Sequence, residues 1–210
     1  MTEKELRNSV ALIMEEWARS GKVYEWSREL QCMIERYNQY PDIGRGIAYK
    51  PSLGGWCALG VSVAFMDADL ADIIKPEIGA YEMEKWAKDS GFFRGRDSGY
   101  IPKRGDLIHY AFPRSTETGK VYTQFHVGLV TNCDENILFS TECNVQSRCV
   151  MKEMREWQYN DIVTGFTEVP YYKKASLITI EVPPIPDKTG TYLLAAMNTG
   201  KSKVITWIKQ

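Results

Sequence analysis

The spacing of hydrophobic residues changes once along the chain, close to Gly91, and this change limits the folds that are open to it. Before Gly91, apolar residues recur at the three- and four-residue spacing of amphipathic helices. After it, short apolar segments with period two follow one another across turn-rich connections, which is typical of strands. Helices followed by closely connected strands predict an α+β fold with an antiparallel sheet.

Four helices are expected in the first part of the chain. The first covers residues 3–19 and ends at Gly21, and the second carries an apolar face of Trp26, Leu30, Met33, Ile34 and Tyr37, so that both lie within residues 3–40. The third begins near Cys57 and is apolar most of the way round, which predicts a buried helix. The fourth follows Pro76, a residue that suits the first turn of a helix.

Four strands are expected after the helices, at residues 107–112, 125–132, 136–144 and 161–169, with a hairpin turn at 134–136. A proline cluster at 182–187 reads as a stiff connector. Beyond it, two strands are expected around the turn N-T-G-K. We therefore divide the chain into a main domain at 1–170 and an extension at 171–210.

Composition excludes several classes of function. The 210 residues carry a formal net charge of −1 with basic residues scattered along the chain, which argues against a nucleic-acid partner. No apolar run is long enough for membrane insertion, and the N-terminus lacks the pattern of a signal peptide, so synthesis in the cytoplasm is expected. Five cysteines without a C-x-x-C pair fit neither a disulfide framework nor a zinc site. We expect no metal and no cofactor, and the oligomeric state stays open.

The residues best suited to chemistry are one cysteine and one of the two histidines. Cys57 follows G-G-W at the start of the third predicted helix, where unpaired backbone N–H groups and the helix dipole favour a thiolate and can stabilise an oxyanion. His126 begins a predicted strand. The next strand carries Glu142 and Asn144, which share a face and lie alongside the start of the His126 strand across a tight hairpin. Such a neighbour can orient the imidazole as a general base.

Four segments in order carry a resemblance to a known family: W-C-A at a helix start, I-P-K-R-G-D-L-I-H-Y, F-H-V-G-L-V and S-T-E-C-N. Over residues 50–150 the chain resembles the CHAP family of cysteine, histidine-dependent amidohydrolases and peptidases. The resemblance implies a papain-like α+β fold, with the catalytic cysteine at the N-terminus of a helix packed on the sheet. It assigns Cys57 as nucleophile, His126 as base and then acid, Glu142 as the residue that orients His126, and Asn144 as a further polar site residue.

The same resemblance suggests that Gly105 and Asp106 shape a turn and that His109 is structural. Where the family has E-G-N this chain has E-C-N, so Cys143 is expected to point to the opposite face of the strand from Glu142. Some members bind calcium through an acidic loop ahead of the cysteine, but the corresponding stretch here has only Asp42, so no metal is predicted.

Most relatives of this kind cut peptidoglycan, so the resemblance implies an N-acetylmuramoyl-L-alanine amidase or a cross-bridge endopeptidase. A phage endolysin made without a signal peptide and released to the cell wall fits the N-terminus. Three alternatives stay open. The chain could be a secreted antibacterial effector with the same chemistry. It could be a cytosolic thiol amidase acting on a small amide such as a glutathione conjugate. It could also be a catalytically silent structural or binding module of a phage particle.

Overall fold

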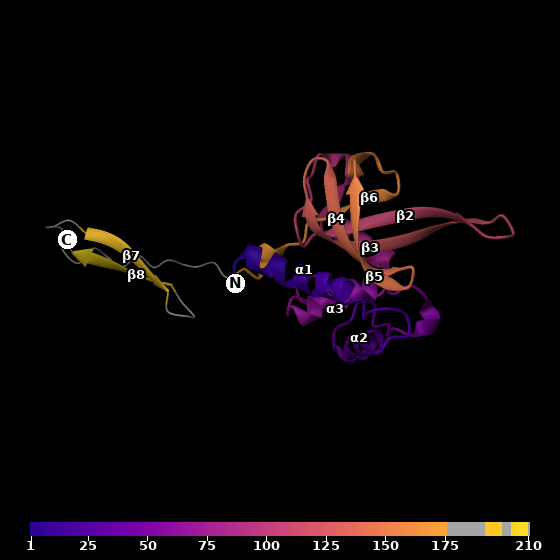
Figure 1. Cartoon of the computed structure of the whole chain (residues 1–210), viewed down its shortest axis with the longest axis horizontal. Coiled ribbons are helices and arrows are strands. Elements are labelled where there is room, and N and C mark those ends of the chain that lie inside the picture. Colours follow the sequence, from indigo (N-terminus) through magenta and orange to yellow (C-terminus); the bar gives the residue numbers. More distant parts are fainter. Residues whose placement is uncertain (176–191, 199–202, 210) are drawn as a thin grey trace. The chain divides into compact units, whose positions relative to one another are not determined.

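The computed structural model describes residues 1–175, 192–198 and 203–209 (Figure 1). The chain divides into two compact units, Met1–Ala175 and Ser176–Gln210. The first unit ends five residues beyond the sequence-based boundary at 170, because the side chain of Tyr171 is fully buried in it and donates to the Gly105 carbonyl. The expected connector at 182–187 lies outside the described residues.

The first unit is an α+β fold, as the change of hydrophobic spacing predicts. Its helices are α1 (Glu3–Ser20), α2 (Arg28–Gln39), α3 (Cys57–Asp67) and α4 (Ala80–Asp89), with short 3₁₀ turns at Pro51–Leu53, Arg96–Ser98, Trp157–Tyr159 and Tyr171–Lys173. Six strands then form one antiparallel sheet in the order β1-β6-β2-β3-β4-β5. They are β1 (Phe93–Gly95), β2 (Leu107–Ser115), β3 (Val121–Cys133), β4 (Ile137–Val145), β5 (Arg148–Arg155) and β6 (Val163–Thr167).

The second unit contains the two antiparallel strands expected in the tail, β7 (Tyr192–Asn198) and β8 (Lys203–Lys209). Most of the predicted N-T-G-K turn lies outside the described residues.

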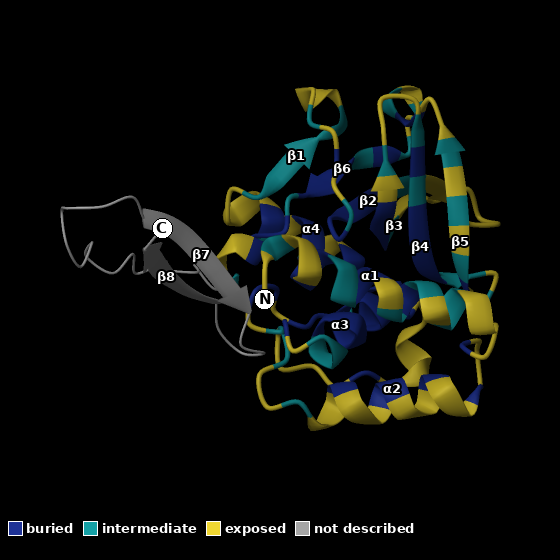
Figure 2. Ribbon diagram, turned by 60° about the vertical axis from the view of Figure 1, so that its left-hand side comes forward, coloured by how far each residue is buried: buried dark blue, intermediate teal, exposed yellow. Residues whose placement is uncertain are grey.

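Hydrophobic residues pack on both faces of the sheet. The larger cluster joins the helices to one face and includes Leu59, Val63, Val127, Leu129 and Cys143. A smaller cluster on the alternate residues of the same strands contains Ile108, Tyr110, Val130, Leu138 and Phe166. Helix α3 lies at the centre of the larger cluster and is almost entirely buried, whereas the outer side of α2 is exposed (Figure 2). The prediction of a buried third helix is confirmed.

Two predictions about helix starts are wrong. Trp26 does not lie on the buried face of α2: the helix begins at Arg28, Ser27 caps it by accepting from the Leu30 N–H, and Trp26 stands before the cap with 79% of its surface exposed. Pro76 does not open α4, which begins at Ala80. The Glu77 carboxylate accepts the N–H groups of Ile78 and Gly79 and so holds a turn between them.

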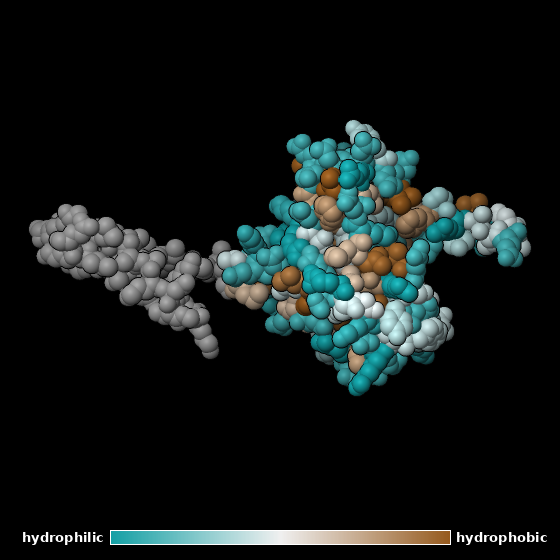
Figure 3. Space-filling view, in the orientation of Figure 1, coloured by the Kyte–Doolittle hydropathy of each residue, from teal (hydrophilic) through white to brown (hydrophobic). Residues whose placement is uncertain are grey.

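The number and the bounds of the strands differ from those predicted. β5 was not predicted because it is an edge strand and four of its eight residues are charged, and β1 has only three residues. β6 is shorter than the predicted 161–169. β2 and β3 are longer than predicted and continue as a two-stranded ribbon, paired out to Ser115 and Val121, that projects beyond the sheet (Figure 1). Hydrophobic residues gather near the root of this ribbon on the face shown in Figure 3.

The turn into β2 is fixed from α1. Arg7 donates to Oδ1 of the fully buried Asp106 at 2.7 Å, and Tyr100 donates to Oδ2 at 2.6 Å. Gly105 has φ +90°, and a Cβ there would lie 2.8 Å from the Tyr171 hydroxyl and 3.2 Å from the Arg7 backbone, so only glycine fits. These contacts agree with the architectural role expected for Gly105 and Asp106.

Candidate active site

Cys57 is the first residue of α3, and its side chain is 6% exposed. The preceding residue, Trp56, makes no side-chain hydrogen bond to the helix terminus, so the first backbone N–H groups of α3 have no side-chain cap. These N–H groups are available to donate to an oxyanion at the start of the helix. The placement of Cys57 at a helix start is as expected from its sequence context.

His126 and Glu142 come from the neighbouring strands β3 and β4 and meet directly. The His126 Nε2 lies 2.9 Å from Glu142 Oε2. Because Nε2 is occupied by the carboxylate, Nδ1 is the ring nitrogen left for Cys57, whose interaction with His126 raises the pKa of the imidazole. The structure therefore brings together three of the predicted site residues, which are far apart in the sequence.

Glu142 is fully buried and its carboxylate accepts four side-chain donors. His126 and Lys152 Nζ, the latter at 2.7 Å, bind Oε2, while the Tyr110 hydroxyl at 2.6 Å and Ser140 Oγ at 2.8 Å bind Oε1. Burial raises the pKa of Glu142, but the hydrogen bond to His126 and the charge of Lys152 outweigh it and lower the pKa to about 2. The Glu142 carboxylate is therefore negatively charged at neutral pH and is hydrogen-bonded to the His126 imidazole.

Sequence reasoning missed Tyr110, Ser140 and Lys152. Tyr110 pairs with His126 in the β2–β3 register, and the two ring centroids are 5.6 Å apart. The tyrosine therefore contacts the imidazole and donates to its carboxylate partner at once. Alternation along β2 could have indicated Tyr110: successive side chains of a strand point to opposite faces, so Tyr110 and His109 cannot both face the site. Nothing local marks Lys152, because β5 itself was not predicted.

His126 is set to carry a proton at neutral pH. Burial lowers its pKa, but hydrogen bonds to Cys57 and Glu142 and their charges raise it from 6.5 to about 9. Its contribution to folding stability is therefore complete below pH 6.5 and is lost as the pH rises through 9. The contribution of Glu142 has the opposite sign: it is present above pH 4.5 and is lost as the pH falls through 2.

We expect the His126 ring to titrate well above the ordinary range. An NMR titration of its Cε1–H signal should give a midpoint near pH 9, and Glu142→Gln should move that midpoint down because the carboxylate charge is lost. His109 serves as the internal reference: it is fully buried, and burial lowers its pKa to about 3. A His126 midpoint near 6.5 that does not respond to Glu142→Gln would contradict this electrostatic reading.

The residue two positions after His126 is Gly128, and the packing of Glu142 against it requires a glycine. A Cβ on Gly128 would lie 2.5 Å from Glu142 Cγ and 3.2 Å from the Thr141 carbonyl oxygen. The absence of a side chain lets Glu142 lie across β3 on its way to His126. Gly128 belongs to the motif F-H-V-G-L-V, but the motif alone does not show that this glycine makes room for Glu142.

Gly128→Ala should therefore displace Glu142 and weaken the network. We expect a loss of about 1–3 kcal/mol in the free energy of unfolding, typical of overpacking a dense core, together with a lower His126 midpoint in the NMR titration. Gly95→Ala is the matched control, because a Cβ there meets nothing within 4 Å and its φ is −59°. Equal effects of the two substitutions would disprove the close fit at Gly128.

Asn144 is placed differently from the regular alternation expected after Glu142. The β4–β5 register shifts between Glu142 and Val145, and Asn144 has φ +60° in the left-handed region. Its Nδ2 comes within 3.0 Å of the position that a Cβ on Gly55 would occupy. The amide thus lies beside the loop that leads into Cys57, although it does not continue the face of Glu142.

The remaining expectations concern residues outside the network. His109 Nε2 lies 2.7 Å from Thr167 Oγ1 inside the sheet. Cys143 packs on α3, where a Cβ on Gly60 would lie 2.5 Å from its Sγ, so it points away from Glu142 as expected. Its sulfur is 3.1 Å from that of Cys149, and both are free cysteines.

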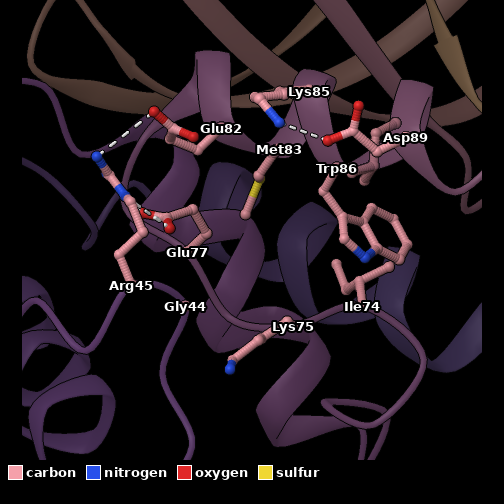
Figure 4. A pocket seen from close by; sticks show the side chains of 11 residues that line it. Gly44, Arg45, Ile74, Lys75, Glu77, Glu82, Met83, Lys85, Trp86 and Asp89 are labelled. Carbon is pink, nitrogen blue, oxygen red and sulfur yellow. Dashed lines mark hydrogen bonds and ion pairs between the residues drawn. The ribbon is translucent and has the colours of Figure 1, made fainter.

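A separate cavity of about 220 Å³ lies between α4 and the loop around Arg45 (Figure 4). Its charged groups pair with their neighbours. Arg45 binds Glu77 through two hydrogen bonds and also contacts Glu82, Lys85 binds Asp89, and Lys75 binds Asp42. The cavity includes none of the predicted site residues.

Among the described residues, no three side chains of His, Cys, Asp or Glu group together as a metal site would require. In the same part of the chain, no helix combines the length and the apolar character needed to cross a membrane. Comparisons of the chain with protein-family models, curated proteins and solved structures gave no match.

Proposed function

We propose that the chain is a thiol-dependent amide hydrolase with a papain-like, CHAP-type catalytic unit. The observation that carries the proposal is the connected set Cys57, His126 and Glu142, in which a helix-terminal cysteine meets an imidazole whose other nitrogen is held at 2.9 Å by a buried carboxylate. This is the arrangement that nucleophilic catalysis by cysteine requires: nucleophile, base and a third group that orients the base.

In the proposed reaction, Cys57 Sγ attacks the carbonyl carbon of the amide and forms a tetrahedral intermediate. His126 then transfers its proton to the leaving nitrogen as the C–N bond breaks, which leaves a thioester on Cys57. A water molecule, deprotonated by His126, attacks the thioester and releases the acid and the free thiol. Backbone N–H groups at the start of α3 stabilise the oxyanion, and Asn144, beside Gly55, is suited to contact the substrate.

The substrate we propose is peptidoglycan, cut at the muramoyl–alanine amide or within the peptide cross-bridge, with the enzyme acting at the cell wall after release. The sequence motifs around Cys57, His126 and Glu142 support this choice. The test is digestion of purified peptidoglycan of several chemotypes under reducing conditions, followed by mass spectrometry of the new ends. Free muramic lactyl groups together with N-terminal alanine indicate an amidase, and new ends inside the bridge indicate an endopeptidase.

If no chemotype is cut while small amides are hydrolysed in a Cys57-dependent way, the peptidoglycan proposal is wrong and the small-amide alternative replaces it. If neither substrate class is cut, the hydrolase proposal itself fails.

A further inference from the structure

A second cavity, of about 390 Å³, adjoins the loop that leads into Cys57. Two of its lining residues, Gly54 and Trp56, belong to the segment that leads directly into Cys57. The volume lies within the range of about 300–1,000 Å³ that is usual for small-molecule pockets. A group held in this cavity would therefore contact the loop that positions Cys57.

The walls of the cavity are anchored to the candidate active site. Tyr49 donates its hydroxyl to the Gly54 carbonyl at 2.6 Å. The Asn38 side chain in turn binds the backbone of Tyr49: it accepts from the Tyr49 N–H and donates to the Tyr49 carbonyl. On the other side, the Glu25 N–H donates to the Ser147 carbonyl at 2.8 Å. Ser147 lies in the hairpin that follows Glu142 and Asn144, so both walls are fixed relative to the catalytic residues.

The lining combines an apolar floor with a polar rim. Leu30, Ile34, Tyr49 and Trp56 are each less than 10% exposed and form the apolar part, whereas Glu25, Arg28 and Gln31 are exposed. Arg28 has no hydrogen bond or ion pair among the described residues. The Trp56 indole N–H is also buried without a partner in the described part of the chain. A ligand that combines apolar surface with hydrogen-bond acceptors would match this lining.

Trp26 contributes an aromatic surface at the edge of this cavity. Its side chain is 79% exposed and its backbone has φ +69°, a left-handed conformation that is unfavourable for a bulky residue. A strained residue that holds a large aromatic ring in solvent beside a pocket suggests a role in binding. The broad apolar face of an indole matches the C–H face of a pyranose ring, whose hydroxyls remain free for polar neighbours.

From these observations we propose that the cavity lined by Trp26, Tyr49 and Trp56 binds an N-acetylated hexosamine unit of the substrate. The sugar ring lies against Trp26, the acetyl methyl lies on the apolar floor, and the acetamido oxygen accepts from Trp56. The inference rests on the proposed hydrolase function and refines it, because a sugar site beside Cys57 favours cleavage at the junction between glycan and peptide over cleavage within the bridge.

The test is an NMR titration of the full-length protein with a β-1,4-linked trimer of N-acetylglucosamine, which contains no bond that the proposed reaction hydrolyses at this site. We expect a saturable shift of the Trp26 indole N–H signal, assigned through Trp26→Phe, and a much weaker response to a glucose trimer. Trp26→Ala should weaken binding by about threefold to tenfold. Tyr159→Ala should leave it unchanged, since Tyr159 is equally exposed, at 82%, and does not line the cavity.

A structural role for Trp26 is separated from a binding role by Trp26→Asn, because asparagine tolerates the left-handed region. We expect the melting temperature of this variant to stay equal or rise while sugar binding falls; a lowered melting temperature would instead make Trp26 a structural residue. Two other results would overturn the proposal: no saturable response to the N-acetylated trimer, or a stem peptide that shifts the Trp26 signal where the sugar does not.

Failure here is distinguishable from failure of the proposed function. Cys57-dependent hydrolysis of peptidoglycan that is insensitive to Trp26→Ala disproves the sugar site alone. Sugar binding that depends on Trp26, without any Cys57-dependent hydrolysis, leaves the site standing and disproves the hydrolase.

Discussion

On the proposed mechanism, Cys57→Ala should reduce hydrolysis of peptidoglycan by at least about a thousandfold, because loss of the proposed nucleophile leaves only the binding and oxyanion contributions to catalysis. The fold should survive, since alanine favours helices and replaces the thiol with a smaller apolar group. The measurement is the initial rate of release of new ends by wild-type and variant protein under the same reducing conditions, with circular dichroism to establish that both are folded.

The matched control is Cys32→Ala. Cys32 is an exposed free cysteine on α2, outside the catalytic network, so its removal should leave the rate unchanged. A Cys57→Ala protein that retains activity within about tenfold of wild type would rule out covalent catalysis by this thiol.

The second large effect is expected for Glu142→Gln. The carboxylate is fully buried and accepts from four donors, so an amide there leaves the Lys152 charge unpaired and turns an N–H₂ group toward donors. The Lys152 side chain is 37% exposed and stays hydrated, so the cost is that of mismatched buried donors and acceptors, about 1–3 kcal/mol. The rate should also fall by about a hundredfold or more, because the imidazole loses the group that orients it. Urea denaturation and the assay of released ends measure the two effects separately.

Glu153→Gln on β5 controls for loss of one negative charge. Glu153 is exposed and, within the described part of the chain, pairs with Arg155 alone; such a surface pair contributes about 0–1 kcal/mol. If Glu142→Gln were no more destabilising than this variant, the four contacts to Glu142 could not be the source of its stabilising effect.

The fold class could be predicted from sequence because it depends on hydrophobic spacing, which is local. The three- and four-residue pattern located α1 and α3, and the alternating segments located β2, β3 and β4. Trp26 shows where spacing alone misleads. It has the right interval for the face of α2, but the capping preference of Ser27 starts the helix after it.

The candidate site was predictable only for residues with distinctive chemistry. Cys57, His126 and Glu142 stand out by residue type and context, and the structure brings them together. Tyr110 and Lys152 depend on the register of strand pairs, which the sequence does not determine locally. Ser140 lies two residues before Glu142 on β4, so alternation along that strand could have indicated it. Gly128 is part of a sequence motif, but the need for a glycine there comes from the Glu142 side chain, which crosses over it from the next strand.

The long sequence separation between Cys57 and its partners has a consequence for how activity arises during folding. Cys57 belongs to the helical half of the chain, whereas His126 and Glu142 lie on strands that pair with each other and pack with α3 only when the sheet is assembled. Non-local contacts of this kind form late, because closing a long loop costs entropy before any contact compensates for it. A nascent chain in which only α1–α4 have formed has a cysteine at a helix terminus but no imidazole to activate it. On the proposed mechanism, the site is complete only once β3 and β4 have packed against α3.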